Sequence, residues 1–221
     1  LSRQLDEPAY IFTGDPAGVD VVTDGRTRRE TDFGRVTNNR SHLFAATEEA
    51  RQDRPVWNPT THPLGSQTVQ GWDGIAGVTA SSSASDADST LRLGPGYGPA
   101  AAFDGDPRTG WISGGLGAAR GEYLDIAFAQ PIRLEAVRVQ TLRDDRLGAP
   151  PARVAFETES GTITGEVFPN GVVEVQLSDS VTTWLRVRLD AVGPGVENAF
   201  GIAEIDIDDR LIAPRTVVPP V

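Results

Sequence analysis

The oxygen-bearing side chains with the most ordered spacing in the sequence lie in the segment 101–111. Asp104 and Asp106 stand on either side of Gly105, and the hydroxyl of Thr109 follows three residues later. A tight turn of this composition can present carboxylate, hydroxyl and carbonyl oxygens to a hard cation, and Ca²⁺ takes about six to eight such oxygens. The same residues can also form a simple Asp-Gly turn that Thr109 closes by hydrogen bonding. The spacing alone leaves both interpretations open.

Other residues that could do catalytic chemistry are poorly arranged for it. The two histidines, His42 and His62, stand in an irregular region, and the sequence has no nucleophile elbow, Walker loop or His-Glu zinc motif. The acidic pairs 144–145 and 208–209 are adjacent in sequence. Neighbouring side chains on an extended strand point to opposite faces, so neither pair suits the two-carboxylate mechanism of glycoside hydrolysis. We therefore predict that this chain is not itself an enzyme.

Composition narrows the class of protein further. The 221 residues include 31 acidic and 20 basic ones, which gives a formal charge of -11, so nucleic acid is a poor partner. The absence of Cys excludes disulfides and thiolate zinc sites. The sequence has no Met, even at position 1, and no apolar run of about 18 residues. We expect a fragment or processed product whose signal or membrane anchor, if any, lies outside it.

Short alternating segments dominate the chain after Tyr123. Seven of them read as strands: 123–128, 132–141, 153–157, 162–167, 172–177, 183–189 and 202–207. Turn residues such as Gln130-Pro131 and Asn170-Gly171 separate them, and no helix of ordinary length fits between them. Within these segments Val137, Val139 and the alternating Leu185, Val187 and Leu189 mark a buried face. This pattern predicts an antiparallel sandwich.

The order of several motifs resembles that of the discoidin (coagulation factor 5/8 type C) domain. These motifs are Ala102-Phe103-Asp104-Gly105 with Thr109 and Trp111, Tyr123-Leu124-Asp125-Ile126, Pro131-Ile132, Val137-Arg138-Val139, and Gly201-Ile202-Ala203-Glu204-Ile205. The resemblance implies an all-β, antiparallel jelly-roll β-sandwich of the galactose-binding-like kind over residues 72–212. Residues 1–71 would form an irregular N-terminal extension that packs on the sandwich and adds one or two strands. Residues 213–221 would be a C-terminal linker or a terminal edge segment.

A narrower resemblance covers the whole chain. The segments 22–34, 39–41 and 79–88 are similar to the soluble part of the arabinofuranosyltransferase D family. This implies a non-catalytic carbohydrate-binding module, tethered on the extracytoplasmic side of the membrane through its parent protein. Its partners would be a neutral cell-wall polysaccharide, arabinan or galactan, and the membrane-embedded catalytic domain of the parent. The alternative is a structural or docking module of the same glycosyltransferase with no sugar binding of its own.

The discoidin resemblance implies a structural Ca²⁺ as cofactor. Asp104 would supply its carboxylate, Asp106 a backbone carbonyl, Thr109 its hydroxyl and carbonyl, and Glu204 a carboxylate from the last strand. Such a cation would join an early turn to the end of the domain and neutralise two carboxylates. The alternative is that Glu204 pairs with Arg108 instead.

Sugar sites in the discoidin family lie on loops at one end of the sandwich. The positions that match those loops are Tyr97, Arg143, Asp145, Arg146, Asn198 and Phe200. Tyr97 or Phe200 would stack on a sugar ring, and the others would hydrogen-bond its hydroxyls. Phe200 can instead belong to the core, where Trp111 and Trp184 are also expected, and the segment 143–146 can be a solvated turn with self-compensating charges. The loops contain no convincing pair of exposed aromatic residues, which keeps the docking alternative open.

Overall fold

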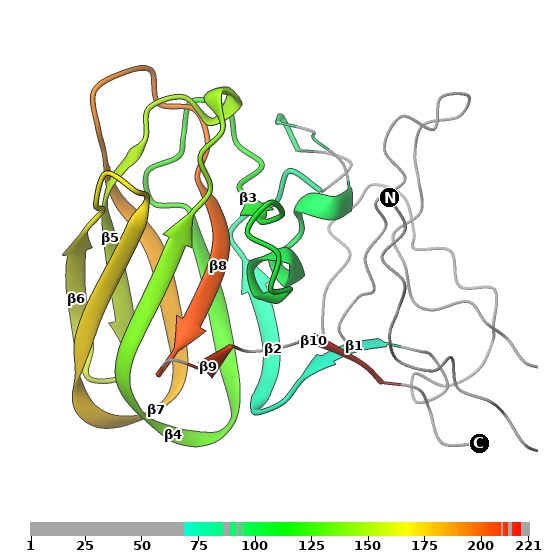
Figure 1. Cartoon of the computed structure of the whole chain (residues 1–221), viewed down its shortest axis with the longest axis vertical. Helices are drawn as coiled ribbons and strands as arrows, with labels where there is room; N and C mark the ends of the chain where they lie inside the picture. The colour runs from blue at the N-terminus through cyan, green and yellow to red at the C-terminus, as the bar shows by residue number, and fades with distance from the viewer. Residues whose placement is uncertain are drawn as a thin grey trace, which may run out of the picture.

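The computed structural model describes residues 69–85, 89–91, 93, 95–208, 210–211 and 214–217. Within them lie ten strands: β1 (Val69–Trp72), β2 (Ile75–Ala80), β3 (Trp111–Ile112), β4 (Tyr123–Thr141), β5 (Pro151–Thr158), β6 (Gly161–Glu166), β7 (Val172–Val192), β8 (Gly201–Ile207), β9 (Arg210–Leu211) and β10 (Pro214–Val217). The helices of this part are three short 3-10 turns: η2 (Pro95–Tyr97), η3 (Pro99–Phe103) and η4 (Asp145–Leu147). Figure 1 shows the strands wrapped into one body. The predicted all-β, antiparallel jelly-roll β-sandwich is confirmed.

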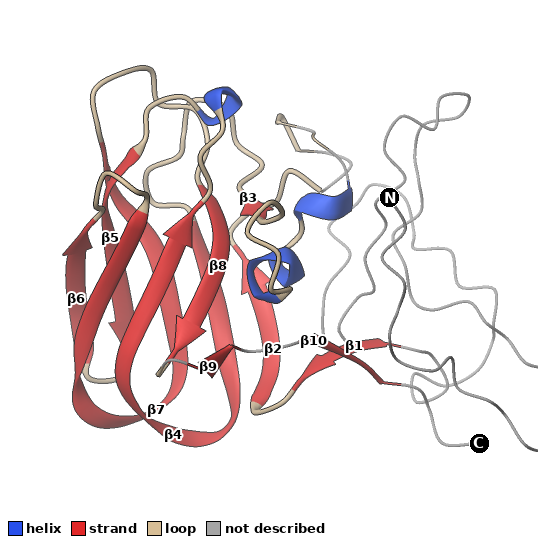
Figure 2. Cartoon of the chain, in the orientation of Figure 1, coloured by secondary structure: helices blue, strands red, loops and turns tan. Residues whose placement is uncertain are grey.

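Two long, bent strands, β4 and β7, take part in both layers of the sandwich (Figure 2). The first part of β4, residues 123–127, pairs with 184–188 of β7 and with β2. Its last part, 136–140, pairs with 172–176 of β7, and β8 lies on its other side. One layer is therefore β2-β4-β7-β5-β6, and the other is built from β8 and the remaining halves of β4 and β7.

The strands β4 and β7 each join two of the predicted strands: 123–128 with 132–141, and 172–177 with 183–189. The pairing of β4 with β7 breaks between Ala127 and Ile132, so Pro131 falls where the ladder needs no amide hydrogen. A proline at such a break bends a strand without ending it. The Gln130-Pro131 pair therefore carries β4 from one layer to the other, where the sequence pattern predicted a turn between separate strands.

The core lies between the two layers and follows the predicted alternation. Val137 and Val139 face inward from the second half of β4, and each is 0% exposed. Leu185 and Val187 face inward from β7, also at 0%. Phe156 of β5 completes the same cluster. These apolar side chains give the layers a common buried face from which the loops at the sandwich end project.

The prediction for the two tryptophans is confirmed for one and wrong for the other. Trp111 is fully buried, its indole N–H donates to the carbonyl of Ser82 at 2.9 Å, and its ring meets that of Phe200 edge to face. Trp184 is only half-buried and lies on the outer face of the sheet. It alternates with Leu185, which points into the core, so the pleat of β7 turns Trp184 outward.

Two short strands at the edge of the sheet belong at least partly to the predicted terminal segments 1–71 and 213–221. β1 begins inside the predicted N-terminal extension and pairs with β2 and with β10. β10 lies inside the predicted C-terminal linker. His42 and His62 fall outside the described residues, and the boundaries at 71 and 212 stay predictions. In the part of the chain that the structure describes, no helix is long and apolar enough to cross a bilayer.

Candidate functional site

The turn after η3 is held by its own oxygen atoms. Asp104 Oδ1 accepts a hydrogen bond of 2.8 Å from the backbone N–H of Asp106. The Thr109 hydroxyl lies 2.6 Å from Asp104 Oδ2 and 2.8 Å from the Asp106 carbonyl oxygen. Gly105 has a φ of 71°, in the left-handed region that glycine occupies without strain. The residues predicted from their spacing therefore form one compact, oxygen-rich turn.

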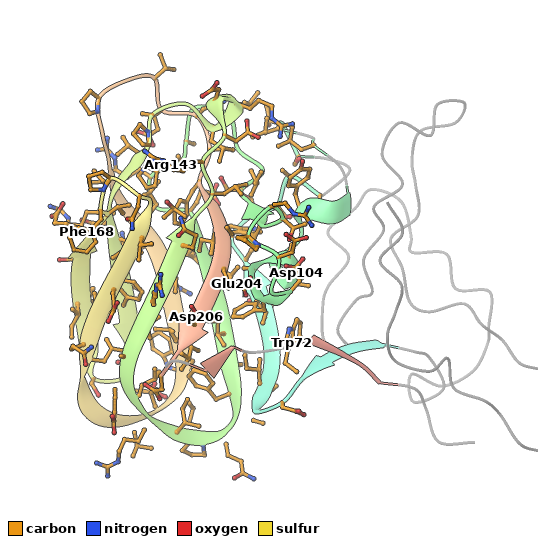
Figure 3. All side chains as sticks on the ribbon, in the orientation of Figure 1. Trp72, Asp104, Arg143, Phe168, Glu204 and Asp206 are labelled. Carbon is orange, nitrogen blue, oxygen red and sulfur yellow. The ribbon has the colours of Figure 1, made fainter. Side chains whose placement is uncertain are left out.

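Glu204 reaches this turn from β8, as Figure 3 shows. Its residue is 8% exposed, and among the described residues neither of its carboxylate oxygens has a hydrogen-bond partner. Burial first, and then the charges of Asp104 and Asp206, raise the pKa of Glu204 to about 8. The nearby backbone N–H of Gly105 lowers this pKa only in part, and it lies outside hydrogen-bonding geometry. A buried carboxyl without a partner is costly when it is ionised, so at neutral pH Glu204 is mostly protonated.

Arg108 does not form an ion pair with Glu204. Its guanidinium forms a two-pronged ion pair with Asp106, with N–O distances of 2.9 and 2.8 Å. The predicted alternative, a Glu204–Arg108 pair, is therefore wrong. The Arg108 side chain is largely solvent-exposed, so this pair orders the turn without neutralising Glu204.

The oxygen atoms of the turn are of the kinds that a hard cation binds. Two carboxylates, those of Asp104 and Glu204, are far apart in the sequence but lie close together in the structure. No group of three or more acidic or imidazole side chains suited to a metal occurs in the described ranges, so hydroxyl and carbonyl oxygens of Thr109 and Asp106 would complete the set. Carboxylate, hydroxyl and carbonyl oxygens are the ligands that Ca²⁺ prefers, and an unpaired buried carboxylate is the group that a cation would satisfy.

An open hollow of about 380 Å³ lies beside this turn, at the loop end of the sandwich. The residues that line it are Tyr97, Pro107, Arg108, Gln140, Thr141, Leu142, Arg143, Asp144, Arg146 and Ala203. Three of the six predicted sugar-binding residues, Tyr97, Arg143 and Arg146, therefore share one concave surface. Arg108 comes from the turn, and Ala203 precedes Glu204 on β8, so the hollow borders the candidate cation site.

Arg146 is held in place by several neighbours. It forms an ion pair with Asp144, whose side chain also accepts the Arg146 backbone N–H and caps η4. Hydrogen bonding to Asp144, and then to Tyr97, raises the pKa of Arg146 further above its usual range. The Asn198 amide donates to the carbonyl oxygen of Arg146. The predicted alternative of self-compensating charges therefore holds for Arg146 and Asp144. Asn198 does not line the hollow and contacts it only through its hydrogen bond to the Arg146 backbone.

Arg143 and Gln140 are tied to the turn between β6 and β7. Arg143 is exposed and donates to the carbonyl of Pro169, and the Gln140 amide donates to the carbonyl of Asn170 at 3.2 Å. Asp145 is exposed but does not line the hollow. The guanidinium of Arg143 thus stands at the rim, with its position set by a backbone acceptor.

Phe200 cannot serve as a stacking surface in this arrangement. Its side chain is 1% exposed, and its ring packs edge to face on Trp111, with 5.8 Å between ring centroids and an interplanar angle of 89°. The prediction of Phe200 as a sugar-binding residue is wrong, and its alternative as a core residue is confirmed. The reason is that Phe200 fills the space beneath the loop end, where Trp111 needs an apolar partner.

Sequence reasoning missed part of the hollow. Gln140 and Leu142 line it from the end of β4 and the residue after β4. Gln140 alternates with the buried Val139, which would have placed it on the outer side of the strand. Phe168, the exposed aromatic residue beside Pro169, was not predicted either, and it does not line the hollow.

The chain therefore combines an antiparallel β-sandwich with a hollow at its loop end that Tyr97, Arg143 and Arg146 line. Residues 77–208 match the family described as arabinofuranosyltransferase D, third carbohydrate binding module. Because this match covers more than half of the chain, the chain belongs to that family.

Full-length relatives agree with this membership. The alpha-(1->3)-arabinofuranosyltransferase of Mycobacterium tuberculosis is 35% identical over 195 residues, and that of Mycolicibacterium smegmatis is 32% identical over 192 residues. Each alignment covers 85% of this chain and 13% of the relative. A cryo-EM structure of a mutant arabinofuranosyltransferase AftD from Mycobacteria is similar over 88% of this chain and 16% of that chain, with a TM-score of 0.65 and 30% identity. The chain thus corresponds to a small part of these relatives.

Proposed function

We propose that this module binds a neutral cell-wall polysaccharide, arabinan or galactan, through the hollow at its loop end. The observation that carries the proposal is the convergence of Tyr97, Arg143 and Arg146 on that hollow. The Tyr97 ring would lie against the C–H face of a sugar, and the guanidinium groups would donate to its hydroxyls. The formal charge of -11 disfavours acidic polysaccharides, so a neutral ligand suits the surface best.

The binding would be weak, and the chain itself would do no chemistry. A small open hollow supports an affinity near the millimolar end, about -4 to -5 kcal/mol. Such affinity suffices when a module is tethered beside a repeating polymer, because tethering raises the local ligand concentration. We infer an extracytoplasmic module that holds polymer near the membrane-embedded catalytic domain of an arabinofuranosyltransferase.

An NMR titration tests this proposal. Arabino- and galacto-oligosaccharides at about 10 mM, above the expected dissociation constant, should shift the amide signals around Arg143 and Arg146 in a saturable way. Arg143→Ala combined with Tyr97→Ala should abolish these shifts. Asp145→Ala is the matched control, because Asp145 lies on the same loop but does not line the hollow. Unchanged spectra with both sugars would favour the alternative of a docking module.

We also propose that Ca²⁺ binds between the turn and β8. Asp104 and Glu204 would supply carboxylates, Asp106 a carbonyl, and Thr109 its hydroxyl and carbonyl. The supporting observation is that Glu204 is buried with neither oxygen hydrogen-bonded. A bound cation would neutralise this charge and hold the loop end together, which would keep the adjoining hollow in shape.

A further inference from the structure

A second hollow, of about 540 Å³, lies on the outer face of the sheet formed by β2, β4 and β7. Trp184 of β7 lines it and is half-buried. In the sheet register, Ala127 of β4 lies directly opposite Trp184, and Gly77 of β2 lies opposite Ala127. These neighbours lack bulk, so the space beside the indole ring stays open. The hollow is thus a trough of small residues with one large aromatic wall.

Two residues further along the same three strands, Thr79, Asp125 and Arg186 form a polar edge of the trough. Arg186 makes a two-pronged ion pair with Asp125, with N–O distances of 2.6 and 2.8 Å. Its guanidinium also stacks 3.9 Å from the centre of the Tyr123 ring. Thr79 stands opposite Asp125 in the register and lines the same hollow. This edge therefore offers fixed donors and acceptors whose charges compensate each other.

We propose that this trough is a second glycan-binding site, with Trp184 as its stacking platform and the Asp125–Arg186 pair as its hydrogen-bonding edge. The ligand is a strand of neutral polysaccharide. A sugar ring has an apolar C–H face, which suits an indole, and hydroxyls at its rim, which suit a neutral pair of donor and acceptor. The proposal takes its ligand class from the proposed function but uses a different face of the module.

Charge and rigidity favour this occupant over a second copy of the chain. Two copies that each carry a formal charge of -11 repel each other, whereas a neutral polymer meets no such barrier. The trough is built on three paired strands, so its walls are preorganised, and little ordering free energy is lost on binding. One polymer that engages both hollows would gain from the high effective concentration of the second site.

Two variants test the trough in the whole chain. Trp184→Ala removes the platform, and Ala127→Arg places a long side chain in the trough from an exposed position directly opposite Trp184. Arabino-oligosaccharide at about 10 mM should shift the amide signals of Gly77 and Ala127 and the indole signal of Trp184. In each variant the sugar should no longer shift the trough signals of the residues that were not replaced. The shifts near Arg143 should stay as in the wild type. Thr162→Ala, on the same sheet layer but away from the trough, should keep both sets.

Each outcome separates this proposal from the loop-end one. Saturable shifts at the trough that both variants remove support it, whether or not the Arg143 region responds. Shifts confined to the Arg143 region overturn the trough and leave the proposed function standing, and the absence of both overturns both. Sedimentation that shows a dimer of the wild type and a monomer of Ala127→Arg also overturns it, because the trough then serves a second copy.

Discussion

Glu204 on β8 lies beside Asp104 in the turn after η3. Among the described residues, neither carboxylate oxygen of Glu204 has a hydrogen-bond partner. Two acidic groups that are distant in the sequence thus share one partly buried site. Because its pKa is about 8, Glu204 is mostly protonated at neutral pH. Above pH 8 and without a cation, repulsion between the two carboxylates works against the contact between turn and strand, whereas a bound cation would favour the ionised form of Glu204 and stabilise the contact.

The first prediction is that chelation destabilises the module. A chelator should lower the melting temperature, and added Ca²⁺ should restore it, because a ligand that binds only the native state stabilises by about 2.7 kcal/mol at a hundred times its dissociation constant. Asp104→Ala should abolish the response. Differential scanning calorimetry with elemental analysis checks this. An unchanged melting temperature with no bound metal would leave the turn as a hydrogen-bonded Asp turn.

The second prediction is that Glu204→Gln raises the free energy of unfolding without Ca²⁺ and lowers it with Ca²⁺. At pH 9 the Glu204 carboxyl is ionised even with its pKa raised to about 8, so the amide should stabilise the chelated protein by about 1 to 3 kcal/mol. With saturating Ca²⁺ the same variant should be less stable than the wild type, because it lacks one anionic ligand. Urea denaturation under both conditions measures the difference. A variant that is more stable in both would contradict the role of Glu204 as a ligand.

The third prediction concerns the close approach of the turn to β8 at Gly110. A Cβ at this position would lie 2.5 Å from the carbonyl oxygen of Ile202 and 3.0 Å from the Cα of Ala203, and both are backbone atoms. Gly110→Ala should therefore push the turn away from β8 and destabilise the domain by about 1 to 3 kcal/mol.

Thermal unfolding checks the Gly110 prediction, with a decrease of about 2 to 4 °C expected per kcal/mol in a chain of this size. Gly115→Ala is the matched control, because the nearest atom to its added Cβ, a carboxylate oxygen of Glu122, would be 3.4 Å away, at the limit of ordinary van der Waals contact. The control should stay within about 0.5 kcal/mol of the wild type. Equal effects of the two variants would argue against a tight approach at Gly110.

The fourth prediction is a loss of stability in acid that depends on Glu159. Burial raises the pKa of Glu159, but hydrogen bonds from the hydroxyls of Thr182 and Thr183 and from the Thr183 N–H outweigh it and hold the pKa at about 2, below its usual 4.5. The folded state therefore keeps the carboxylate ionised when the unfolded chain has already taken up a proton. This stabilisation is present above about pH 4.5 and is lost as the pH falls towards 2.

Urea denaturation between pH 7 and pH 2.5 should show that the stability advantage of the wild type over Glu159→Gln shrinks below about pH 4.5. Glu166→Gln is the control, because its side chain is 74% exposed and lies 3.9 Å from the nearest guanidinium nitrogen. A constant gap between the wild type and Glu159→Gln over the whole range would contradict the prediction.

The alternation of apolar residues was enough to predict the sandwich, because each buried strand repeats it with period two. The same rule applied to β7 would have turned Trp184 outward, since Leu185 and Val187 define the inner face. The prediction of a core Trp184 followed the family resemblance against this local signal. The trough beside Trp184 depends on Ala127 and Gly77 meeting it across three strands, and that register is not encoded in any one segment.

The loop end was predictable in part. The resemblance brought Tyr97, Arg143 and Arg146 to one end of the sandwich, where they line one hollow. It could not tell that Phe200 is buried there, because the burial depends on Trp111, a residue distant in sequence whose ring meets that of Phe200 edge to face. Nor could spacing show that Arg108 would pair with Asp106 and leave Glu204 without a cationic partner.

The last prediction tests the contribution of the buried Phe200 ring to stability. A fully buried ring packed on Trp111 should cost about 3 to 5 kcal/mol when it is reduced to Ala, because a cavity replaces it. Phe200→Leu keeps much of the volume, so it should cost less and should preserve the spectral response of the Arg143 region to oligosaccharide. Phe168→Ala is the control, since a side chain that is 59% exposed should change stability by no more than about 0.5 kcal/mol. Urea denaturation and the NMR titration together decide the matter: a Phe200→Ala protein with wild-type stability and no sugar response would mean that the ring faces the ligand.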